Sequence, residues 1–403
     1  MTVLHVISGE LDKGAARGAL WLHKELRSQG INSILFHTGG KHWDDDELAI
    51  TSSGFFLSKF LVKLVLRLWR NLLTMLYRDS TKELFSSGQG IISLHDLEER
   101  YRPDIIHLHW INHFSVRYSS IAHVQVPVFW TLRDMWPFTG GCHYAVGCRS
   151  FVDECGACPL LGSTRNKDLS RLIFNHKKRT KPVNVHYVGI SRWILREFQQ
   201  SKFASSKVSH VPNGIQTKEW FPVKESTDIL TFAKGRKVIL IGAVNLNAAY
   251  KGGKFIQDLA SKLSATKYCI VAFGRVNSLF TKNLKLDVLS LGVIKDHAYL
   301  RTVYSTSDVY FFPSVLEAFG KTVVESILCG TPVVCFGNSG PGEIVEHEKT
   351  GYICDMLNTS DMVDGVASAS TLKIPAASRM NIARRYSVEH TAKEMITLYK
   401  QAK

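Results

Sequence analysis

The sequence predicts an α/β fold made of two doubly wound domains, each built on a parallel sheet. Short apolar runs typical of buried strands alternate with helix-length segments along the whole chain. This alternation occurs twice, once on each side of the turn Pro212-Asn213-Gly214. At 403 residues the chain is too long for one ordinary core, so two domains are expected.

The expected elements follow in order from the N-terminus, where a helix at Ala15–Gln29 separates the first two strands. The strands of the first series are Val3–Ser8, Asn32–His37, Asp104–His109, Pro127–Leu132 and Val185–Ile190. Those of the second series are Val238–Gly242, Tyr268–Gly274, Val309–Phe312 and Thr331–Phe336. Ser205-Ser206 and the later turn place the boundary near residue 205. The domains expected are therefore 1–205 and 206–386, followed by a last helix at 387–403.

The composition is that of a globular protein, with 45% hydrophobic and 21% charged residues. The first residues enter a strand with no basic region or small-residue cleavage site before it, so a cytoplasmic location is expected. The net charge of +15 favours an anionic partner, which could be nucleic acid, anionic lipid or the phosphates of a smaller ligand.

Two glutamates, Glu317 and Glu325, lie eight residues apart around a predicted strand-to-helix turn. The run 308–312 is predicted to be a buried strand that ends at Pro313, and Gly320 to Leu328 is predicted to be helical. Glu317 is then expected at the carboxyl end of a strand, where open α/β sheets bind ligands, and the helix N-terminus beside it attracts anions. From their spacing alone, the two glutamates could equally be ordinary solvated residues.

The segment from Asp308 to Val345 resembles the E-x7-E signature of retaining family 4 glycosyltransferases. The resemblance implies the GT-B fold, in which two Rossmann-like domains face each other and a C-terminal helix crosses back to the first. It also implies a hexosyltransferase that moves a sugar from a nucleoside-diphosphate sugar to a glycan acceptor, expected to be lipid-linked. Glu317 would bind hydroxyls of the donor sugar and Glu325 the ribose, while backbone groups of Phe319, Gly320 and Lys321 would bind sugar or phosphate.

The resemblance extends to a basic clamp for the donor diphosphate. Lys251 matches the clamp lysine, but Leu246 stands where an arginine is expected. Arg275, at the end of another predicted strand, can supply the missing charge. An exposed basic residue is more often a solvated surface charge than a ligand contact. With these cations and a helix dipole, no catalytic metal is expected.

In the first domain, the turn after the first strand contains Gly14 and Ala15, whose small side chains let a ligand approach the backbone closely. The resemblance places this turn across the cleft from the donor diphosphate. Arg133, a catalytic candidate with Glu317, stands where the family usually has a histidine that contacts the donor sugar and phosphate. Its positive charge remains, but it cannot exchange a proton. His107 and His109 alternate along one strand and should point to one side, in core or supporting roles.

Four of the eight cysteines, Cys142, Cys148, Cys155 and Cys158, fall within seventeen residues. In a reducing compartment such clustering favours a tetrahedral structural zinc site over free thiols or disulfides, and the C-x2-C pair is its strongest part. The segment is similar to an insert of exopolysaccharide-type family 4 transferases, the colanic-acid group among them.

Residues 55–78 combine a broad apolar face with basic side chains at helical spacing, namely Lys59, Lys63, Arg67 and Arg70. This pattern predicts an amphipathic helix that lies on an anionic membrane surface, at the inner face of the membrane. The alternative is a helix packed on the first domain with a basic solvent face.

Two other functions are compatible with parts of the sequence. Sugar-nucleotide epimerases share the two-domain GT-B layout without transferring a sugar to an acceptor. A zinc-containing nucleic-acid-binding protein would explain the cysteines and the positive charge. The cysteine segment lacks interleaved basic and aromatic residues, so nucleic acid is not the expected partner.

Overall fold

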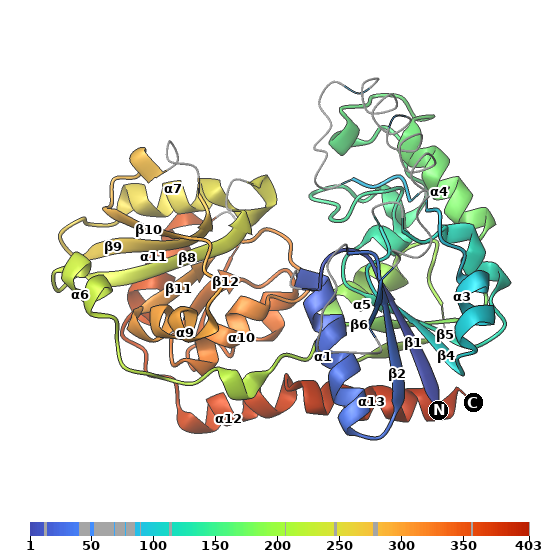
Figure 1. Ribbon diagram of the computed structural model, residues 1–403. Coiled ribbons are helices and arrows are strands. Elements are labelled where there is room, and N and C mark those ends of the chain that lie inside the picture. The colour runs from blue at the N-terminus through green and yellow to red at the C-terminus, as the bar shows by residue number, and fades with distance from the viewer. Residues whose placement is uncertain are drawn as a thin grey trace. The chain divides into compact units, whose positions relative to one another are not determined.

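The computed structural model shows two compact units (Figure 1). The first comprises Met1–Gly214 with Val388–Lys403, and the second comprises Ile215–Ser387. The residues described are 1–11, 14–39, 49–51, 68, 77, 85–88, 90–112, 115–205, 207–245, 248–276, 281–355 and 358–402. The predicted basic helix at 55–78 lies outside the described residues, apart from Leu68 and Tyr77.

The first unit is built on a seven-stranded parallel sheet with the order β3-β2-β1-β4-β5-β6-β7. Its strands are β1 (Thr2–Ile7), β2 (Asn32–His37), β3 (Ala49–Thr51), β4 (Ile105–Leu108), β5 (Val128–Leu132), β6 (Val185–Gly189) and β7 (Val208–His210). Its α-helices are α1 (Gly14–Ser28), α3 (Leu94–Tyr101), α4 (Leu169–Arg179), α5 (Arg192–Gln199) and α13 (Val388–Gln401). Short 3-10 turns are η3 (Tyr118–His123), η4 (Trp136–Phe138), η5 (Ser150–Val152) and η6 (Pro159–Leu161).

The C-terminal helix α13 is part of the core of the first unit. Leu22 and Leu26 of α1 cluster with Met395 and Tyr399 of α13 against the apolar strands. Figure 1 shows α13 running beside α1, and the hydroxyl of Tyr399 lies 2.5 Å from Nδ1 of His107 on β4. The last segment of the chain is therefore held by apolar packing and by a buried polar contact.

The second unit contains a six-stranded parallel sheet with the order β10-β9-β8-β11-β12-β13. Its strands are β8 (Lys237–Asn245), β9 (Tyr268–Arg275), β10 (Val288–Gly292), β11 (Val309–Phe312), β12 (Val333–Phe336) and β13 (Gly351–Cys354). Its α-helices are α6 (Thr227–Ala233), α7 (Gly253–Lys262), α9 (His297–Thr306), α10 (Lys321–Leu328), α11 (Thr359–Ala369) and α12 (Ala376–Arg385). The 3-10 turns η7 (Thr217–Glu219), η8 (Ala249–Lys251) and η9 (Gly340–Glu343) complete it.

Helices cover both faces of this second sheet. Side chains of α7 and α11, such as Ile256 and Met362, cluster on one face with Ile239 of β8 and Phe311 of β11. On the other face Tyr310 of β11 reaches α10, where its hydroxyl lies 3.1 Å from Oγ1 of Thr322. Successive residues of β11 thus point to opposite, equally apolar layers, which is why this strand is a continuous hydrophobic run.

All nine strands predicted from the sequence are present, with ends shifted by a few residues. The structure adds β3, β7, β10 and β13. The boundary between the units falls after Gly214, nine residues beyond the predicted position at 205, because β7 still belongs to the first sheet. The last helix begins at Val388, close to the expected residue 387.

We expect Tyr399→Phe to lower the free energy of unfolding by about 1–3 kcal/mol, because it leaves a buried nitrogen of His107 without its partner. Chemical denaturation measures the change. The matched control is Tyr299→Phe, since Tyr299 is 38% exposed and its loss should stay within about 0.5 kcal/mol. Equal effects of the two substitutions would contradict the role given to the buried contact.

Candidate active site

An ion pair lies at the carboxyl end of the second sheet. Nζ of Lys251, in η8 after β8, is 2.5 Å from Oε2 of Glu317, which follows the neighbouring strand β11. The side chains are only 16% and 18% exposed. Burial alone would lower the pKa of Lys251, but the charge of Glu317, assisted by Tyr250, outweighs it and raises that pKa. The lysine therefore stays protonated, and the structure brings these two predicted site residues together.

Backbone contacts fix the loop that carries Glu317. The N–H of Val315 donates to the carbonyl of Tyr250 at 2.8 Å, and the carbonyl of Glu317 accepts from the N–H of Gly340 at 2.9 Å. Gly252 has a φ of 78°, and a Cβ there would lie 2.0 Å from the carbonyl oxygen of Pro313. A side chain at position 252 would consequently push the two halves of the ion pair apart.

Helix α10 begins next to this loop and carries the second glutamate. Gly320 adopts the left-handed conformation with φ 98° and precedes the first helical residue, Lys321. Phe319 is buried against the ring of Tyr386, with the ring centroids 5.4 Å apart. The helix N-terminus therefore has a fixed position, and its dipole favours an anion there.

Glu325 is buried, with an exposed fraction of 8%. The hydroxyl of Tyr304 on α9 donates to its Oε2 at 3.2 Å. Burial, followed by the nearby charge of Glu325, raises the pKa of Tyr304 well above its ordinary value, so the tyrosine remains a donor. A carboxylate held in this way can accept hydrogen bonds from hydroxyl groups with little loss of side-chain entropy.

Arg275 ends β9, on the other side of β8 from Glu317, and it is exposed. It pairs in register with Asn245 at the carboxyl end of β8. Three neighbouring strands thus bring these residues together, because β9 ends in Arg275, β8 leads to Lys251 and β11 leads to Glu317. The second unit gathers these donor-site predictions at one edge of its sheet, together with Phe319, Gly320, Lys321 and Glu325.

The remaining predicted residues, Arg133, Gly14 and Ala15, belong to the first unit. Gly14 and Ala15 open α1 after β1, and Arg133 follows β5. The guanidinium of Arg133 donates to Oδ1 of Asn213 at 3.0 Å and to Nδ1 of His109 at 3.2 Å. A Cβ on Gly18 would lie 2.9 Å from the same guanidinium, so glycine is needed there to admit it.

A pocket of the first unit is lined by Arg133, Asn213, Gly18, Thr131 and Thr391. Burial lowers the pKa of Arg133 to about 10, which still leaves it charged at neutral pH. Sequence reasoning identified Arg133 but missed Asn213 and Gly18. Asn213 was visible only as a turn residue, and Gly18 as one of several small residues in α1.

Three buried histidines support Arg133. Because Nδ1 of His109 accepts from the arginine, its proton is on Nε2, which donates to Nδ1 of His5 at 2.9 Å. The rings of His107 and His109 lie 4.2 Å apart, which confirms the prediction that they point to one side. Burial, together with the charge of Arg133, lowers the pKa of His107 to about 3. Burial and neighbouring positive charges also lower the pKa of His5 and of His109.

The ring nitrogens of His5, His107 and His109 lie within 4.8 Å of one another, which is a distance suited to a metal ion. The hydrogen bonds of these three histidines, however, leave too few free ring nitrogens to bind a metal ion. Both nitrogens of His107 already contact hydroxyls of Tyr399 and Thr131, and His109 contacts both His5 and Arg133. A cation at this point would also face the guanidinium. The group therefore serves as a neutral support for Arg133.

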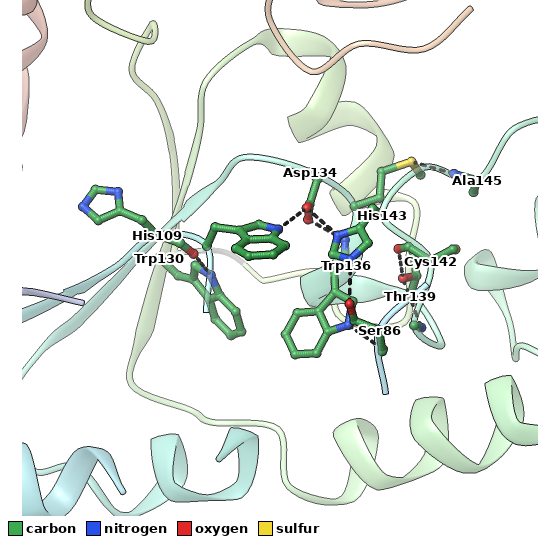
Figure 2. A network of polar contacts seen from close by, with 12 residues as sticks. Ser86, His109, Trp130, Asp134, Trp136, Thr139, Cys142, His143 and Ala145 are labelled. Atoms are coloured by element: carbon green, nitrogen blue, oxygen red, sulfur yellow. Dashed lines mark hydrogen bonds and ion pairs between the residues drawn. The ribbon is translucent and has the colours of Figure 1, made fainter. Parts of the chain in front are cut away.

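Asp134 connects the end of β5 to the cysteine segment, as Figure 2 shows. Its Oδ2 accepts from Nε1 of Trp110 at 2.8 Å and from Nδ1 of His143 at 2.7 Å. Its Oδ1 accepts from the backbone N–H of Trp136 at 2.9 Å. His143 continues the network to the hydroxyl of Ser86, 2.9 Å from its Nε2. One carboxylate thereby orders the loop that immediately follows Arg133.

The four clustered cysteines line a single pocket. All four are free thiols. Burial raises the pKa of Cys155 to about 12 and raises that of Cys142 further above its ordinary value. No three of these sulfur atoms, all in described residues, lie within 4.8 Å of one another. The zinc ligand set therefore stays a prediction, although its members occur together.

Comparison with known proteins identifies the class. The protein family described as "Glycosyl transferases group 1" matches residues 239–386, which make up nearly all of the second unit. An uncharacterized glycosyltransferase of Methanocaldococcus jannaschii is 32% identical over 319 residues, covering 74% of this chain and 75% of that protein. The chain therefore belongs to the group 1 glycosyltransferases.

More specific relatives are more distant or match less of the chain. A putative colanic acid biosynthesis glycosyl transferase, WcaC of Escherichia coli, is 20% identical over 83% of this chain and 82% of its own. A D-inositol 3-phosphate glycosyltransferase of Rhodococcus opacus is 34% identical, but over 26% of this chain and 24% of that relative. The chain therefore spans only about a quarter of the length of that protein. The matching share of its counterpart from Rhodococcus jostii is 23%.

Solved structures show the same architecture. A glycosyltransferase of Rickettsia africae superposes with a TM-score of 0.66 at 17% identity, covering 100% of this chain and 98% of the other. Anabaena HepE in complex with UDP and glucose gives 0.65 at 14% identity, covering 99% of each chain. The fold is GT-B, as the sequence predicted.

We expect the first unit to lose stability as the pH falls from about 6.5, where histidines of an unfolded chain take up protons. The folded protein keeps His107 neutral down to about pH 3, so the unfolded state binds more protons between these values. His107→Gln should reduce the slope by up to about 1.4 kcal/mol per pH unit. Denaturation between pH 7 and 5 measures it. His123→Gln, at an exposed position, should keep the parent slope; an unchanged slope in both variants would contradict the assignment.

Proposed function

We propose that the protein is a retaining glycosyltransferase that moves a sugar from a nucleoside-diphosphate sugar to a glycan acceptor in the biosynthesis of a surface polysaccharide. The observation that carries the proposal is the Lys251–Glu317 pair beside the fixed start of α10. It combines a cation for a diphosphate, a carboxylate for sugar hydroxyls and a helix N-terminus within one strand-end region. Anabaena HepE, which shares the fold, is described in complex with UDP-glucose.

The donor would bind to the second unit. Lys251 and Arg275 neutralise the diphosphate, and the backbone at Phe319–Lys321 binds sugar or phosphate oxygens. Glu317 accepts hydrogen bonds from sugar hydroxyls, and Glu325 accepts them from the ribose. Positive charge aimed at the departing diphosphate stabilises the transition state more than the ground state, since negative charge develops there as the bond breaks.

Transfer with retention requires the acceptor hydroxyl to attack the face that the diphosphate leaves. The bond between the anomeric carbon and the phosphate oxygen breaks, the bond to the acceptor oxygen forms, and the acceptor proton passes to the leaving phosphate. No side-chain nucleophile is needed for this step. Arg133 contributes a fixed positive charge and no proton transfer, because a guanidinium stays protonated in proteins.

The acceptor is proposed to be a lipid-linked saccharide at the inner membrane face, because residues 55–78 have the composition of a membrane-surface helix. In the part of the chain that the structure describes, no helix is long and apolar enough to span a bilayer. Attachment through a surface helix would hold the enzyme beside such an acceptor without a spanning segment.

The identity of the donor can be tested by thermal-shift screening of UDP-, GDP- and ADP-sugars with the full-length protein. Product analysis with and without a saccharide acceptor then separates a transferase from an epimerase. A transferase gives a lengthened saccharide and free nucleoside diphosphate, whereas an epimerized sugar nucleotide formed without acceptor would overturn the proposal.

We expect Glu325→Gln to weaken binding of the nucleoside diphosphate by about tenfold or more, because a hydrogen bond to a charged group is worth about 1.5–3 kcal/mol. Glu317→Gln should lower kcat by at least about tenfold with donor affinity kept or increased, since Lys251 loses its competing partner. Calorimetry and initial rates measure both. Glu225→Gln, at an exposed site of the same unit, is the control. Normal binding and turnover in both site variants would refute these roles.

Replacing Lys59, Lys63, Arg67 and Arg70 together with Gln should release the protein from anionic liposomes, because each cation near such a surface contributes about 1 kcal/mol. Sedimentation with liposomes measures binding, and added salt should weaken it in the parent. Donor affinity should be unchanged, since the proposed donor residues lie mainly in the other unit. A variant that sediments as well as the parent would argue against membrane attachment through this segment.

A further inference from the structure

The pocket in the first unit that contains Cys142, Cys148, Cys155 and Cys158 has no part in the proposed transfer reaction. Its other lining residues are largely apolar or small, among them Phe85, Ala145 and Phe151. Two of the cysteines, Cys155 and Cys158, are themselves buried. Packing alone does not require four cysteines at one apolar pocket, because one or two aliphatic side chains would fill the same space.

The backbone near Cys155 provides a hydrogen-bond donor to its sulfur atom. The N–H of Gly140 donates to Sγ of Cys155 at 3.2 Å. A Cβ on Gly140 would lie 2.9 Å from the same sulfur, so a side chain there would displace it. Between the two cysteines of the C-x2-C pair, Gly156 and Ala157 both have positive φ, 148° and 44°. This tight turn points both sulfurs toward one pocket, as a metal-binding knuckle requires.

A buried lysine supplies an independent observation. Lys177 on α4 is 1% exposed, and its Nζ donates to the carbonyls of Trp136 at 2.5 Å and Thr139 at 3.1 Å. Among the described residues no carboxylate lies within 4.0 Å of this ammonium group. A buried ammonium ion is costly, and nearby negative charge lowers that cost. The ring of Trp136, whose centroid is 3.4 Å from Nζ, and the charge of Asp134 do so in part.

The cysteine pocket is placed to provide that charge. Lys177 is held against the loop that leads to Cys142 by its hydrogen bonds to the carbonyls of Trp136 and Thr139. The loop is also shared, because Thr139, whose carbonyl accepts from Lys177, donates its hydroxyl to the carbonyl of Cys142 at 2.6 Å. The lysine and the thiols therefore belong to one local structure.

We propose that Cys142, Cys148, Cys155 and Cys158 bind one Zn²⁺ as a tetrathiolate site, with Lys177 as its buried counter-charge. On binding, four thiol protons pass to solvent, and the site acquires a net charge of two minus, which the ammonium ion reduces to one minus. Tetrahedral Zn–S bonds of about 2.3 Å place the sulfurs roughly 3.8 Å apart. Since no three sulfurs lie within 4.8 Å of one another here, metal binding draws them inward.

The metal would join two segments of the first unit. It would connect the loop after η4 to the C-x2-C turn before η6, and Asp134 already connects that loop to the end of β5. Its role is therefore structural, and it lies outside the transfer chemistry. This proposal goes beyond the proposed function and does not depend on it.

The first test is metal binding by the full-length protein. Protein produced with zinc in the medium should contain about one zinc per chain by elemental analysis. Replacement by Co²⁺ should give the visible absorption and thiolate charge-transfer bands of a tetrahedral cobalt tetrathiolate. Absence of stoichiometric metal together with absence of these bands overturns the proposal, as does detection of two disulfides among the four cysteines by mass spectrometry without reduction.

Variants separate the ligands from the counter-charge. Cys148→Ser, at a half-buried position, should lose stoichiometric zinc, whereas Cys354→Ser in the second unit should keep it. Lys177→Met should weaken zinc affinity by about 10–100-fold, as loss of a supporting group around a metal site does, and exposed Lys178→Met should not. Full zinc retention by Cys148→Ser overturns the ligand set. Parent affinity in Lys177→Met overturns the counter-charge assignment.

Discussion

Parallel strand pairing is the constraint on which the rest of the structure depends. Every strand pair recorded within the two sheets is parallel. A parallel strand must be followed by a crossover, so all strand-to-helix loops of a sheet emerge at one edge. That is why Lys251, Glu317 and Arg275, which are 24 to 66 residues apart in the sequence, collect at one edge of the second sheet. In the first unit the same rule places the starts of α1 and of the Arg133 loop at one edge.

The sequence predicted the interior of both sheets but not their margins. The four strands that escaped prediction, β3, β7, β10 and β13, are the outermost strands of the two sheets. An interior strand such as β11 is buried on both faces and forms a continuous apolar run, whereas all five residues of β10 retain exposure. A strand is recognised in the sequence by the apolar run that its burial requires. Strands that are less buried, or that have only three residues as β3 and β7 do, contain too short an apolar run to be recognised.

The same distinction applies to the site. Lys251 and Glu317 were selected because they match motif positions of the family that the sequence resembles. Their position at the ends of predicted strands, shared with Arg275, supported the choice, because it is a local property of the sequence. The partners of Arg133 were not accessible in this way, because Asn213 lies 80 residues away and its contact depends on how the whole first unit folds. The spacing of residues in the sequence also could not reveal that Lys177 contacts the loop before Cys142, since Lys177 lies on a separate element, α4.

The Lys251–Glu317 pair also bears on which ligands the proposed donor site would accept. Each side chain is mostly buried, so a ligand that takes one partner away must replace it for the other. Inorganic phosphate could pair with the lysine, but it would leave a buried carboxylate without a cation, a change of about 3–5 kcal/mol. A molecule that carries a phosphate and neighbouring hydroxyl donors satisfies both groups at once. In the proposed donor site, the ion pair would therefore disfavour common cellular anions, although the protein has a strongly positive charge.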